Sequence, residues 1–514
     1  MKIDKLIIFL GLSFPLSLLH AKLWMLPLFS LFLLILYAFQ QASKKVKSRN
    51  EIRTQSHRFL FHLALSLRIS PNFEEAVRFA FENSGETLRR EIGVYIFRAT
   101  LGQTSYEHAL EEFARKWDLE LFTRLLPILR SSIEMRPHER EQTLDEAVRQ
   151  ILEYEREGLF SFCSWLHHPL LILYSVGILL PVALLPSLPV LSAFGLNLGT
   201  AGLLSFLLFS LILTHLASQY LIAKSPLFHQ LEDAKPVTSH VLLSPLAGLP
   251  FLWLGGGELK IWMLLWVPTL FLCFFLWTAC QEEVRRRRES LQMEEELPAV
   301  LRQVGGSMIK GQSAEEALLK LRGGKLSELL RKGSLNVLLG NLDLHSSLFD
   351  PRKGVLREIQ SNEIKEALTL AFSVVRRSTS ESGRTLIKLS DHLTELRRVK
   401  GEGQRLLSTT VSSMRSLSLF FGPAILAITA RMFLLLQIKG SVFLSVSLNP
   451  SVLLLILGTY CLGMCWILLT LCHRVGGGDR NTERYLLAQA LPLSLAVFTV
   501  FSLFGYQLIE SLLK

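Results

Sequence analysis

Glycine, lysine and serine come together at 323–327, which read GGKLS and contain the residue types of a phosphate-binding loop. A loop of that kind needs the spacing G-x-x-x-x-G-K-[ST], because several backbone N–H groups must face the phosphate before the lysine. Here the two glycines are adjacent, so the loop cannot form. The glycines at 476–478 have no lysine after them. We therefore expect no nucleotide-hydrolysing site.

Metal-binding and nucleophilic motifs are also missing. The sequence contains no HExxH, no CxxC and no GxSxG. Cys461 and Cys465 share a helix face at i, i+4, and we interpret them as apolar packing. His167 and His168 precede a proline at a membrane boundary, where an interfacial role is the simpler interpretation. We expect no catalytic residue, no cofactor and no metal, so the chain is not predicted to be an enzyme.

Paired acids mark the starts of several predicted helices. Glu74 and Glu75 follow Asn72, Glu107 follows Ser105, and Glu315 and Glu316 follow Ser313. Asn and Ser cap helices with their side-chain oxygens, and acids in the first turn favour the positive end of the helix dipole. We expect exposed helix starts there, and these acids are candidates for contact with a partner protein.

Basic residues gather just beyond two apolar stretches. One run covers 44–49, and the other is formed by Arg285, Arg286, Arg287 and Arg288. Such runs set the orientation of a membrane protein and attract anionic lipids, at about 1 kcal/mol per charge near the surface. Topology and lipid contact explain both runs, and contact with an acidic partner surface is the alternative for them.

Three residues stand out inside apolar stretches. Pro181 and Pro423 each remove a backbone donor and permit a bend. Arg431 costs about 2.5–3.5 kcal/mol to insert at a helix centre. It either extends its side chain to the outer face or faces the other half of the chain or a helix of a partner protein. We take these three as candidates for coupling motion through the membrane.

Composition explains where these residues lie. Half of the chain is hydrophobic and its mean hydropathy is +0.35, yet 19% of its residues are charged. Charge is concentrated in two blocks, and a membrane span needs roughly 17–25 apolar residues. We predict about nine spans, with the first two as a hairpin turning near 19–22; a cleaved signal peptide is the alternative for 1–22. The windows are 6–19, 23–39, 168–191, 198–222, 240–256, 258–280, 413–438, 451–472 and 485–509.

The net charge of +11 is interpreted as a topology signal. With nine spans, both charged blocks fall on the same side, and nearly all Lys and Arg fall there with them. Positive residues favour the cytoplasmic side. We therefore expect a multi-pass protein of the cell membrane with cytoplasmic charged domains. Nucleic-acid binding is not needed to explain the charge.

The chain also resembles itself. Glu74 and Glu315 are 241 positions apart, and Pro181 and Pro423 are 242 apart. Helical periodicity fills both charged blocks, and each has enough apolar positions for its own core. We predict an all-α protein with two helical bundles in a tandem parallel repeat. Its expected parts are 1–42 (transmembrane hairpin), 43–165 (first cytoplasmic bundle), 166–280 (four spans), 281–412 (second cytoplasmic bundle) and 413–514 (three spans).

The capped helix starts at 72–77, 101–110, 313–318 and 339–348, together with the proline-containing spans, resemble the type II secretion system F family. The two bundles and many spans look most like its archaeal, TadC-like members, which serve adhesive pili and the archaellum. At the fourth helix start Ser347 stands where the pattern has a small alanine and no Glu follows Asp343, so this start departs from the family pattern.

The resemblance implies a membrane platform for a type IV pilus-like or type II secretion machine. Such a platform couples a hexameric cytoplasmic ATPase to the movement of pilin-like subunits, and it works as a homo-oligomer, a dimer. The acids and arginines named above would then contact the ATPase. A polytopic transporter or channel is the alternative, although few acids lie within the predicted spans and a parallel repeat is not typical of transporters. A receptor or signalling scaffold is a further alternative.

Overall fold

The structure, a computed structural model, is helical throughout the part it describes and contains no β-strand there. The predicted all-α class is therefore confirmed. The predicted windows 6–19 and 240–256, the turn near 19–22 and Asp343 lie outside the described residues. Those residues are 25–193, 200–225, 258–340, 344–350, 354–359, 361–375, 379–439 and 449–513.

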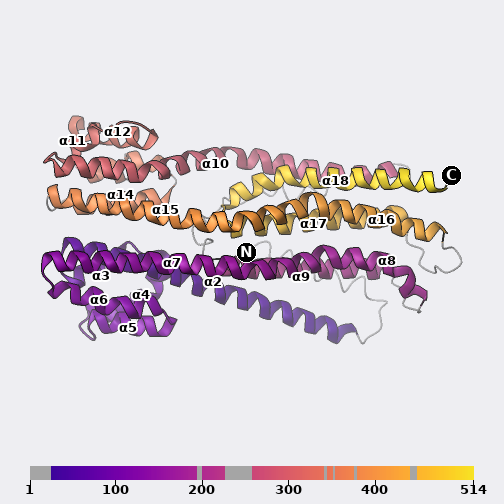
Figure 1. Cartoon of the computed structure of the whole chain (residues 1–514), viewed down its shortest axis with the longest axis horizontal. Coiled ribbons are helices and arrows are strands. Elements are labelled where there is room, and N and C mark those ends of the chain that lie inside the picture. Colours follow the sequence, from indigo (N-terminus) through magenta and orange to yellow (C-terminus); the bar gives the residue numbers. More distant parts are fainter. Residues whose placement is uncertain are drawn as a thin grey trace.

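The N-terminal half begins with a long helix, continues through short ones and returns through another long helix (Figure 1). Its elements are α2 (Met25–Ile69), α3 (Phe73–Glu82), α4 (Glu86–Thr100), α5 (Tyr106–Trp117), α6 (Glu120–Ser131), the 3-10 turn η1 (Ser132–Glu134), α7 (Pro137–Tyr174), the π-helix η2 (Ser175–Leu179), α8 (Leu180–Ala193) and α9 (Thr200–Lys224).

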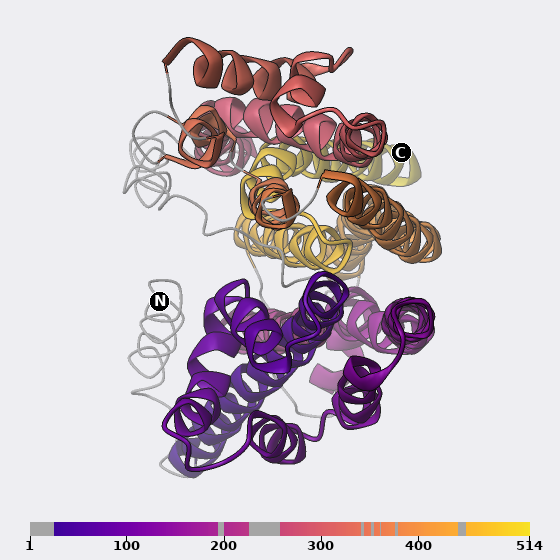
Figure 2. The ribbon, with the colours of Figure 1, turned by 90° about the vertical axis from the view of Figure 1, so that its left-hand side faces the viewer.

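The C-terminal half follows a similar course and adds a last long helix. Its elements are α10 (Glu258–Ile309), α11 (Ala314–Leu319), α12 (Lys325–Gly340), α13 (Leu344–Phe349), the 3-10 turn η5 (Val355–Glu358), α14 (Asn362–Val375), α15 (Thr379–Ser416), the π-helix η6 (Leu417–Phe421), α16 (Gly422–Lys439), α17 (Pro450–Val475) and α18 (Arg480–Leu513). Seen from the end, the two halves lie one beside the other (Figure 2).

The predicted domain boundaries fall inside continuous helices. Residues 42, 165, 280 and 412 lie within α2, α7, α10 and α15. Each of these helices runs from the charged bundles into the apolar region without a loop, as Figure 1 shows. A helix transmits displacement along its axis better than a flexible linker does. Each boundary is thus the point where one continuous helix passes from a charged bundle into the apolar region.

The predicted capping residues start the short helices. The Asn72 side chain accepts hydrogen bonds from the backbone N–H groups of Glu74 and Glu75, at 3.1 and 3.3 Å. Ser105 accepts from the N–H of His108 at 3.2 Å, and Ser313 accepts from that of Glu316 at 3.2 Å. These bonds satisfy donors that the first turn of a helix leaves unpaired. The helix starts at Asn72 and Ser313 are confirmed.

Six helices among the described residues are long and apolar enough to cross a membrane, which indicates a membrane protein. Six of the predicted windows overlap them, and 451–472 lies wholly inside one. Residues 25–39 of the window 23–39 form the first part of α2. Most side chains of this first part are not among those that the structure describes. The helices are Pro137–Ser187, Gly202–Lys224, Lys260–Ile309, Ser382–Leu434, Pro450–Val475 and Arg480–Gly505.

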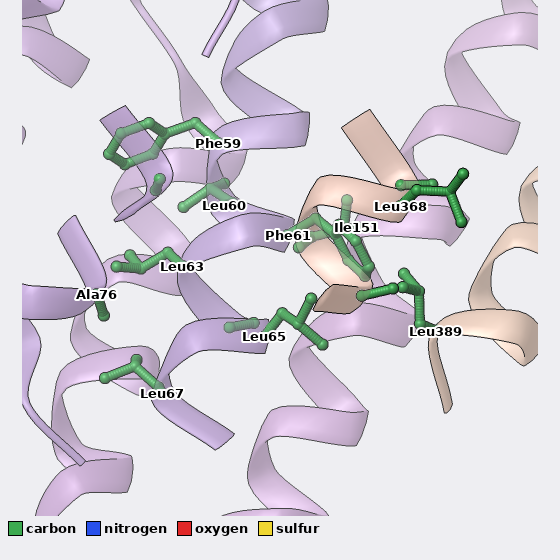
Figure 3. Close-up of a cluster of buried hydrophobic side chains, with 14 of the residues drawn as sticks. Phe59, Leu60, Phe61, Leu63, Leu65, Leu67, Ala76, Ile151, Leu368 and Leu389 are labelled. Carbon is green, nitrogen blue, oxygen red and sulfur yellow. The ribbon is translucent and has the colours of Figure 1, made fainter. Parts of the chain in front are cut away.

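The two charged blocks share one hydrophobic core, whereas the sequence predicts a core for each. Buried residues of both halves form a single cluster. At its centre Phe61 and Ile151 of the N-terminal half lie beside Leu368 and Leu389 of the C-terminal half (Figure 3). Burial of apolar area contributes about 25 cal/mol per Å², so this shared cluster holds the bundles against each other.

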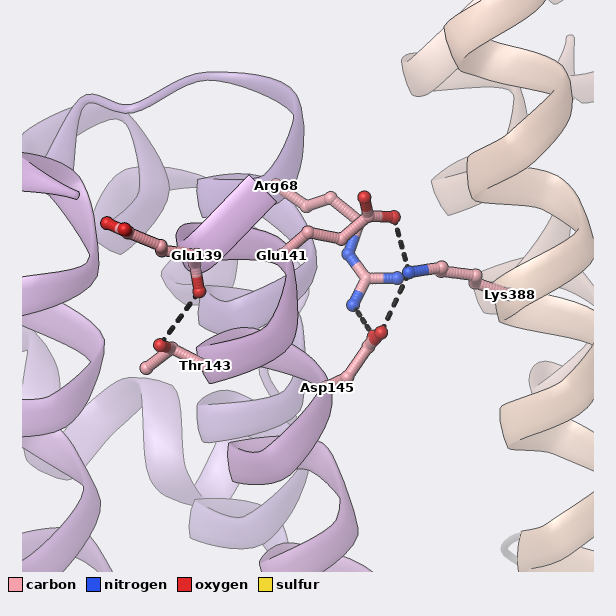
Figure 4. A network of polar contacts seen from close by, with 6 residues as sticks. All are labelled: Arg68, Glu139, Glu141, Thr143, Asp145 and Lys388. Atoms are coloured by element: carbon pink, nitrogen blue, oxygen red, sulfur yellow. Dashed lines mark hydrogen bonds and ion pairs between the residues drawn. The ribbon is translucent and has the colours of Figure 1, made fainter. Parts of the chain in front are cut away.

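An ionic cluster reinforces the same interface. The Lys388 ammonium of α15 donates to the carboxylates of Glu141 and Asp145 on α7, and Arg68 of α2 pairs with Asp145 (Figure 4). The hydrogen bond from Lys388 lowers the pKa of Glu141 below its ordinary value. Because one lysine serves two acids of the other half, the contact also fixes the register of α15 along α7.

Candidate functional site

Helices α7 and α15, which run from the bundles into the apolar region, are both interrupted at their C-terminal ends. The 38-residue helices α7 and α15 are each followed by a five-residue π-helix. Pro181 lies two residues after η2, and Pro423 lies two residues after η6. A proline lacks the N–H that would bond the carbonyl four residues earlier, and π-turns are a known cause of helix bends. Each predicted bend therefore coincides with a real interruption of the α-helix.

The two interruptions touch each other. Ile178 of η2 is buried against Gly422, the residue that precedes Pro423. A methyl group placed on Gly422 would lie 2.8 Å from the Ile178 Cδ1 atom, which is closer than carbon atoms pack. Glycine at 422 thus allows the close approach of α16 to η2. We call Ile178, Pro181, Gly422 and Pro423 the paired bends.

Helix α17 supplies the hydrogen bond that Pro181 removes. The Tyr460 hydroxyl donates to the carbonyl oxygen of Gly177, which is the acceptor four residues before Pro181. The Ser210 hydroxyl of α9 lies 3.1 Å from the same Tyr460 oxygen and 3.0 Å from the Val176 carbonyl oxygen. Buried carbonyls without a donor are costly in an apolar region. Tyr460 and Ser210 therefore stabilise the bend after α7.

Arg431 lies in the same region but faces another helix. Its side chain is 4% exposed, and its Nε atom donates to the backbone oxygen and the hydroxyl of Ser502 on α18, both at 3.0 Å. Gly505 of α18 leaves room for the aliphatic stem of the arginine. The side chain thus contacts α18, the last helix of the chain, which lies outside the predicted repeat.

The candidate acids of the first bundle lie at its helix starts. Glu74 and Glu75 are exposed, and the Glu75 carboxylate accepts a hydrogen bond from the Ser70 hydroxyl at 2.8 Å. Glu107 is partly buried and pairs with Arg130. These acids lie on α3 and α5, at the opposite end of the molecule from α8 (Figure 1). They form a surface separate from the paired bends.

The second bundle repeats this separation. Glu316 is exposed and Glu315 partly buried at the start of α11, at the end of the molecule away from α16 (Figure 1). The four arginines 285–288 lie on α10, nearer the apolar region. Arg285 and Arg286 pair with Glu282 at 3.0 and 3.2 Å, and Arg287 pairs with Glu294 at 3.3 Å. The structure therefore does not gather the predicted acids and arginines into one site.

The GGKLS segment already holds an anion of the protein itself. The Glu296 carboxylate of α10 accepts hydrogen bonds from the N–H groups of Lys325 and Leu326, at 3.3 and 3.0 Å. It thereby occupies the N-terminus of α12, where a phosphate would otherwise bind. In the first bundle Gln55 does the same for α4 by accepting from the N–H of Leu88 at 2.7 Å. Sequence reasoning missed both residues, because they cap helices far along the chain.

Two buried histidines lie where the bundles meet, outside the apolar windows. His62 of α2 and His392 of α15 are 6% and 7% exposed. The His392 ring stacks on Phe61, with ring centroids 3.5 Å apart and an angle of 9° between the planes. Burial lowers the pKa of each histidine from 6.5 to about 3. Both rings are therefore neutral at pH 7.

Acidification should loosen this interface. Above pH 6.5 both histidines are neutral in the folded and unfolded chain. Below it the unfolded chain takes up protons that the folded chain excludes, so the free energy of unfolding falls, by about 2 kcal/mol per histidine at pH 5. We expect the thermal midpoint of the detergent-solubilised chain to fall between pH 7 and 5. A His62→Phe/His392→Phe variant should show a flatter pH dependence, and an unchanged dependence would contradict this assignment.

Among the residues that the structure describes, no group of three or more His, Cys, Asp or Glu side chains is placed to hold a metal ion. Comparison of the chain with protein-family models finds no match, and comparisons with curated proteins and with solved structures find none either. The described part of the chain and its six candidate spans indicate a helical membrane protein, in which continuous helices join the bundles to the apolar region.

Proposed function

We propose that this protein is a membrane platform of a type IV pilus-like or type II secretion machine, resembling the type II secretion system F family. It would couple a hexameric cytoplasmic ATPase to the movement of pilin-like subunits in the membrane. The observation that carries the proposal is the pair of rods, α7 and α15, each of which leads from a helical bundle to a bend. A displacement of either bundle reaches the paired bends without crossing a flexible loop.

Matched features of the two halves support a tandem repeat in this proposal. Gln55 and Glu296 are 241 positions apart and each caps a helix of its own bundle. The π-helices η2 and η6 begin 242 positions apart. Features at one offset in corresponding roles favour a common unit. Four spans between the bundles would then bring both bundles to the cytoplasmic face, with nine spans in all.

The acids at the starts of α3, α5 and α11 are proposed as ATPase contacts, because they lie at the end of the bundles away from the membrane. Anionic lipids are proposed to contact the arginines 285–288, which lie closer to the apolar region. A homodimer remains part of the proposal on the resemblance alone. The transporter alternative receives no support from the paired bends, which are packed against each other and against Tyr460 and Ser210.

The proposal is tested by purification of the full chain with its ATPase. Glu315→Lys/Glu316→Lys should reduce the ATPase that co-purifies by about fivefold or more, because four units of charge change at the proposed contact. The matched control is Glu289→Lys/Glu328→Lys, which makes the same charge change at a partly exposed and an exposed position of the same bundle. Equal ATPase recovery from both variants would contradict the assigned contact, and no ATPase with the parent chain would contradict the proposed function.

A further inference from the structure

A cavity of about 630 Å³ lies between the two halves, where the bundles approach the apolar region. Its walls come from α2, α7, α10, α14 and α15, with Lys224 at the end of α9. Ligand-binding pockets commonly have volumes of about 300–1,000 Å³. We call it the interdomain cavity. Both halves contribute to it, so an occupant would touch the two bundles at once.

Positive charge dominates the polar lining. Five cations and three glutamates line the cavity, and residues of both kinds contact other side chains. Glu155 lies 3.6 Å from the His57 ring nitrogen, and Glu294 accepts from Arg287 at 3.3 Å and from the Ser361 hydroxyl at 2.6 Å. Cations therefore outnumber acids, and the lining favours an anionic ligand. The lining cations are Arg53, Arg58, Lys224, Arg397 and Lys400.

Two buried imidazoles in the lining have an unused polar atom. The Nδ1 atoms of His62 and His392 have no hydrogen-bond partner among the described residues, although both side chains are more than nine-tenths buried. Buried polar atoms are nearly always paired. A neutral imidazole can donate one hydrogen bond or accept one. Neither Nδ1 atom is accessible to a ligand in the cavity, so the two rings line it without offering this atom for a hydrogen bond.

The membrane-side end of the cavity is aromatic. Phe162 and Trp165 of α7 line it, and the Lys224 ammonium lies 3.4 Å from the centre of the Trp165 ring. Trp165 precedes the apolar window 168–191 by three residues, and Lys224 follows the window 198–222 by two. Tryptophan and lysine at such places are typical of the level of lipid headgroups. The cavity thus reaches from the headgroup level to the imidazoles.

We propose that the interdomain cavity binds the phosphate group of an anionic membrane phospholipid. Arg58 and Arg397, from opposite halves, would contact the phosphate, and the aromatic end would pack on the glycerol and the first carbons of the acyl chains. Arginine binds phosphate oxygens with charge-assisted hydrogen bonds. A bound lipid would then join α2 to α15. This inference does not rest on the proposed secretion function.

The test uses the purified full chain in a mild detergent. Short-chain phosphatidylglycerol is added while the thermal midpoint is measured, with short-chain phosphatidylcholine and sodium phosphate in parallel samples. We expect phosphatidylglycerol to raise the midpoint at lower concentration than phosphatidylcholine does. Arg58→Gln/Arg397→Gln should weaken the apparent affinity for phosphatidylglycerol by at least about tenfold, because charged hydrogen bonds are lost.

The control is Arg49→Gln/Arg398→Gln, which removes the same charge from the same two helices at exposed side chains. It should keep the affinity of the parent. If the first variant does not fold, Lys224→Gln/Lys400→Gln makes the same comparison. Equal affinity of cavity and control variants, or no response to phosphatidylglycerol, would overturn the proposal. Stabilisation by sodium phosphate equal to that by lipid would place the ligand in solution and overturn the assignment to a lipid.

Discussion

Gly305→Val should lower the free energy of unfolding by about 3 kcal/mol. Gly305 of α10 faces Gly383 of α15, and a Cβ atom on Gly305 would lie 2.7 Å from the Gly383 carbonyl oxygen. That neighbour is backbone, so it can move only if the two helices separate. The reverse contact is equally short, since a Cβ atom on Gly383 would lie 2.7 Å from the Gly305 oxygen. The measurement is the thermal midpoint of the detergent-solubilised chain.

The next residue provides the control. A Cβ atom on Gly306 would have no neighbour within 4 Å, so Gly306→Ala meets no obstacle. It should stabilise the chain by about 0.5–1 kcal/mol, because alanine favours the helix more than glycine does. Opposite shifts at two adjacent glycines would establish the close crossing of α10 and α15. Similar shifts at both positions would contradict it.

Tyr460→Phe should lower the free energy of unfolding by about 1–3 kcal/mol. The change removes the hydroxyl that donates to the Gly177 carbonyl, and it leaves that buried oxygen without this donor. It also removes one of the two contacts of the Ser210 hydroxyl, the one at 3.1 Å, and leaves its bond to the Val176 carbonyl. The volume of the ring is kept, so packing contributes little to the loss. The measurement is again the thermal midpoint of the full chain.

A second change separates hydrogen bonding from packing. Pro181→Ala restores a backbone N–H four residues after the Gly177 carbonyl, and this N–H can replace the lost hydroxyl. The effect of Pro181→Ala on the free energy of unfolding should therefore be more favourable in the Tyr460→Phe background than in the parent chain, by about 1 kcal/mol. Strictly additive effects would show that Tyr460 does not compensate for the proline.

Local signals explain what could be predicted from the sequence. Asn72 and Ser313 each precede acids and an apolar run, and a helix cap depends on only a few neighbouring residues. The apolar stretches could be predicted equally well, because the length that a membrane span requires does not depend on its tertiary contacts. The prolines marked the bends for the same reason, since a missing N–H acts on the adjacent turn.

Contacts between distant residues could not be predicted. The Tyr460 hydroxyl donates to the Gly177 carbonyl, 283 positions away, and no local sequence pattern predicts that hydrogen bond. Gln55 and Glu296 have the composition of ordinary surface residues, yet each caps a distant helix. The shared core was missed because apolar periodicity shows which face of a helix is buried and not which helix covers it.

If the protein is a secretion platform, motion of the bundles should pass through the paired bends, and a count of filaments per cell tests this coupling. Strains lacking the gene are supplied with the parent chain, Pro181→Ala, Pro423→Ala or the double variant at matched levels in the membrane. We expect intact insertion and ATPase binding in all four strains, with filament number lowered in each single variant and lowered most, by about fivefold or more, in the double variant. Normal filament numbers in the double variant would contradict the account and would show that the prolines serve packing alone.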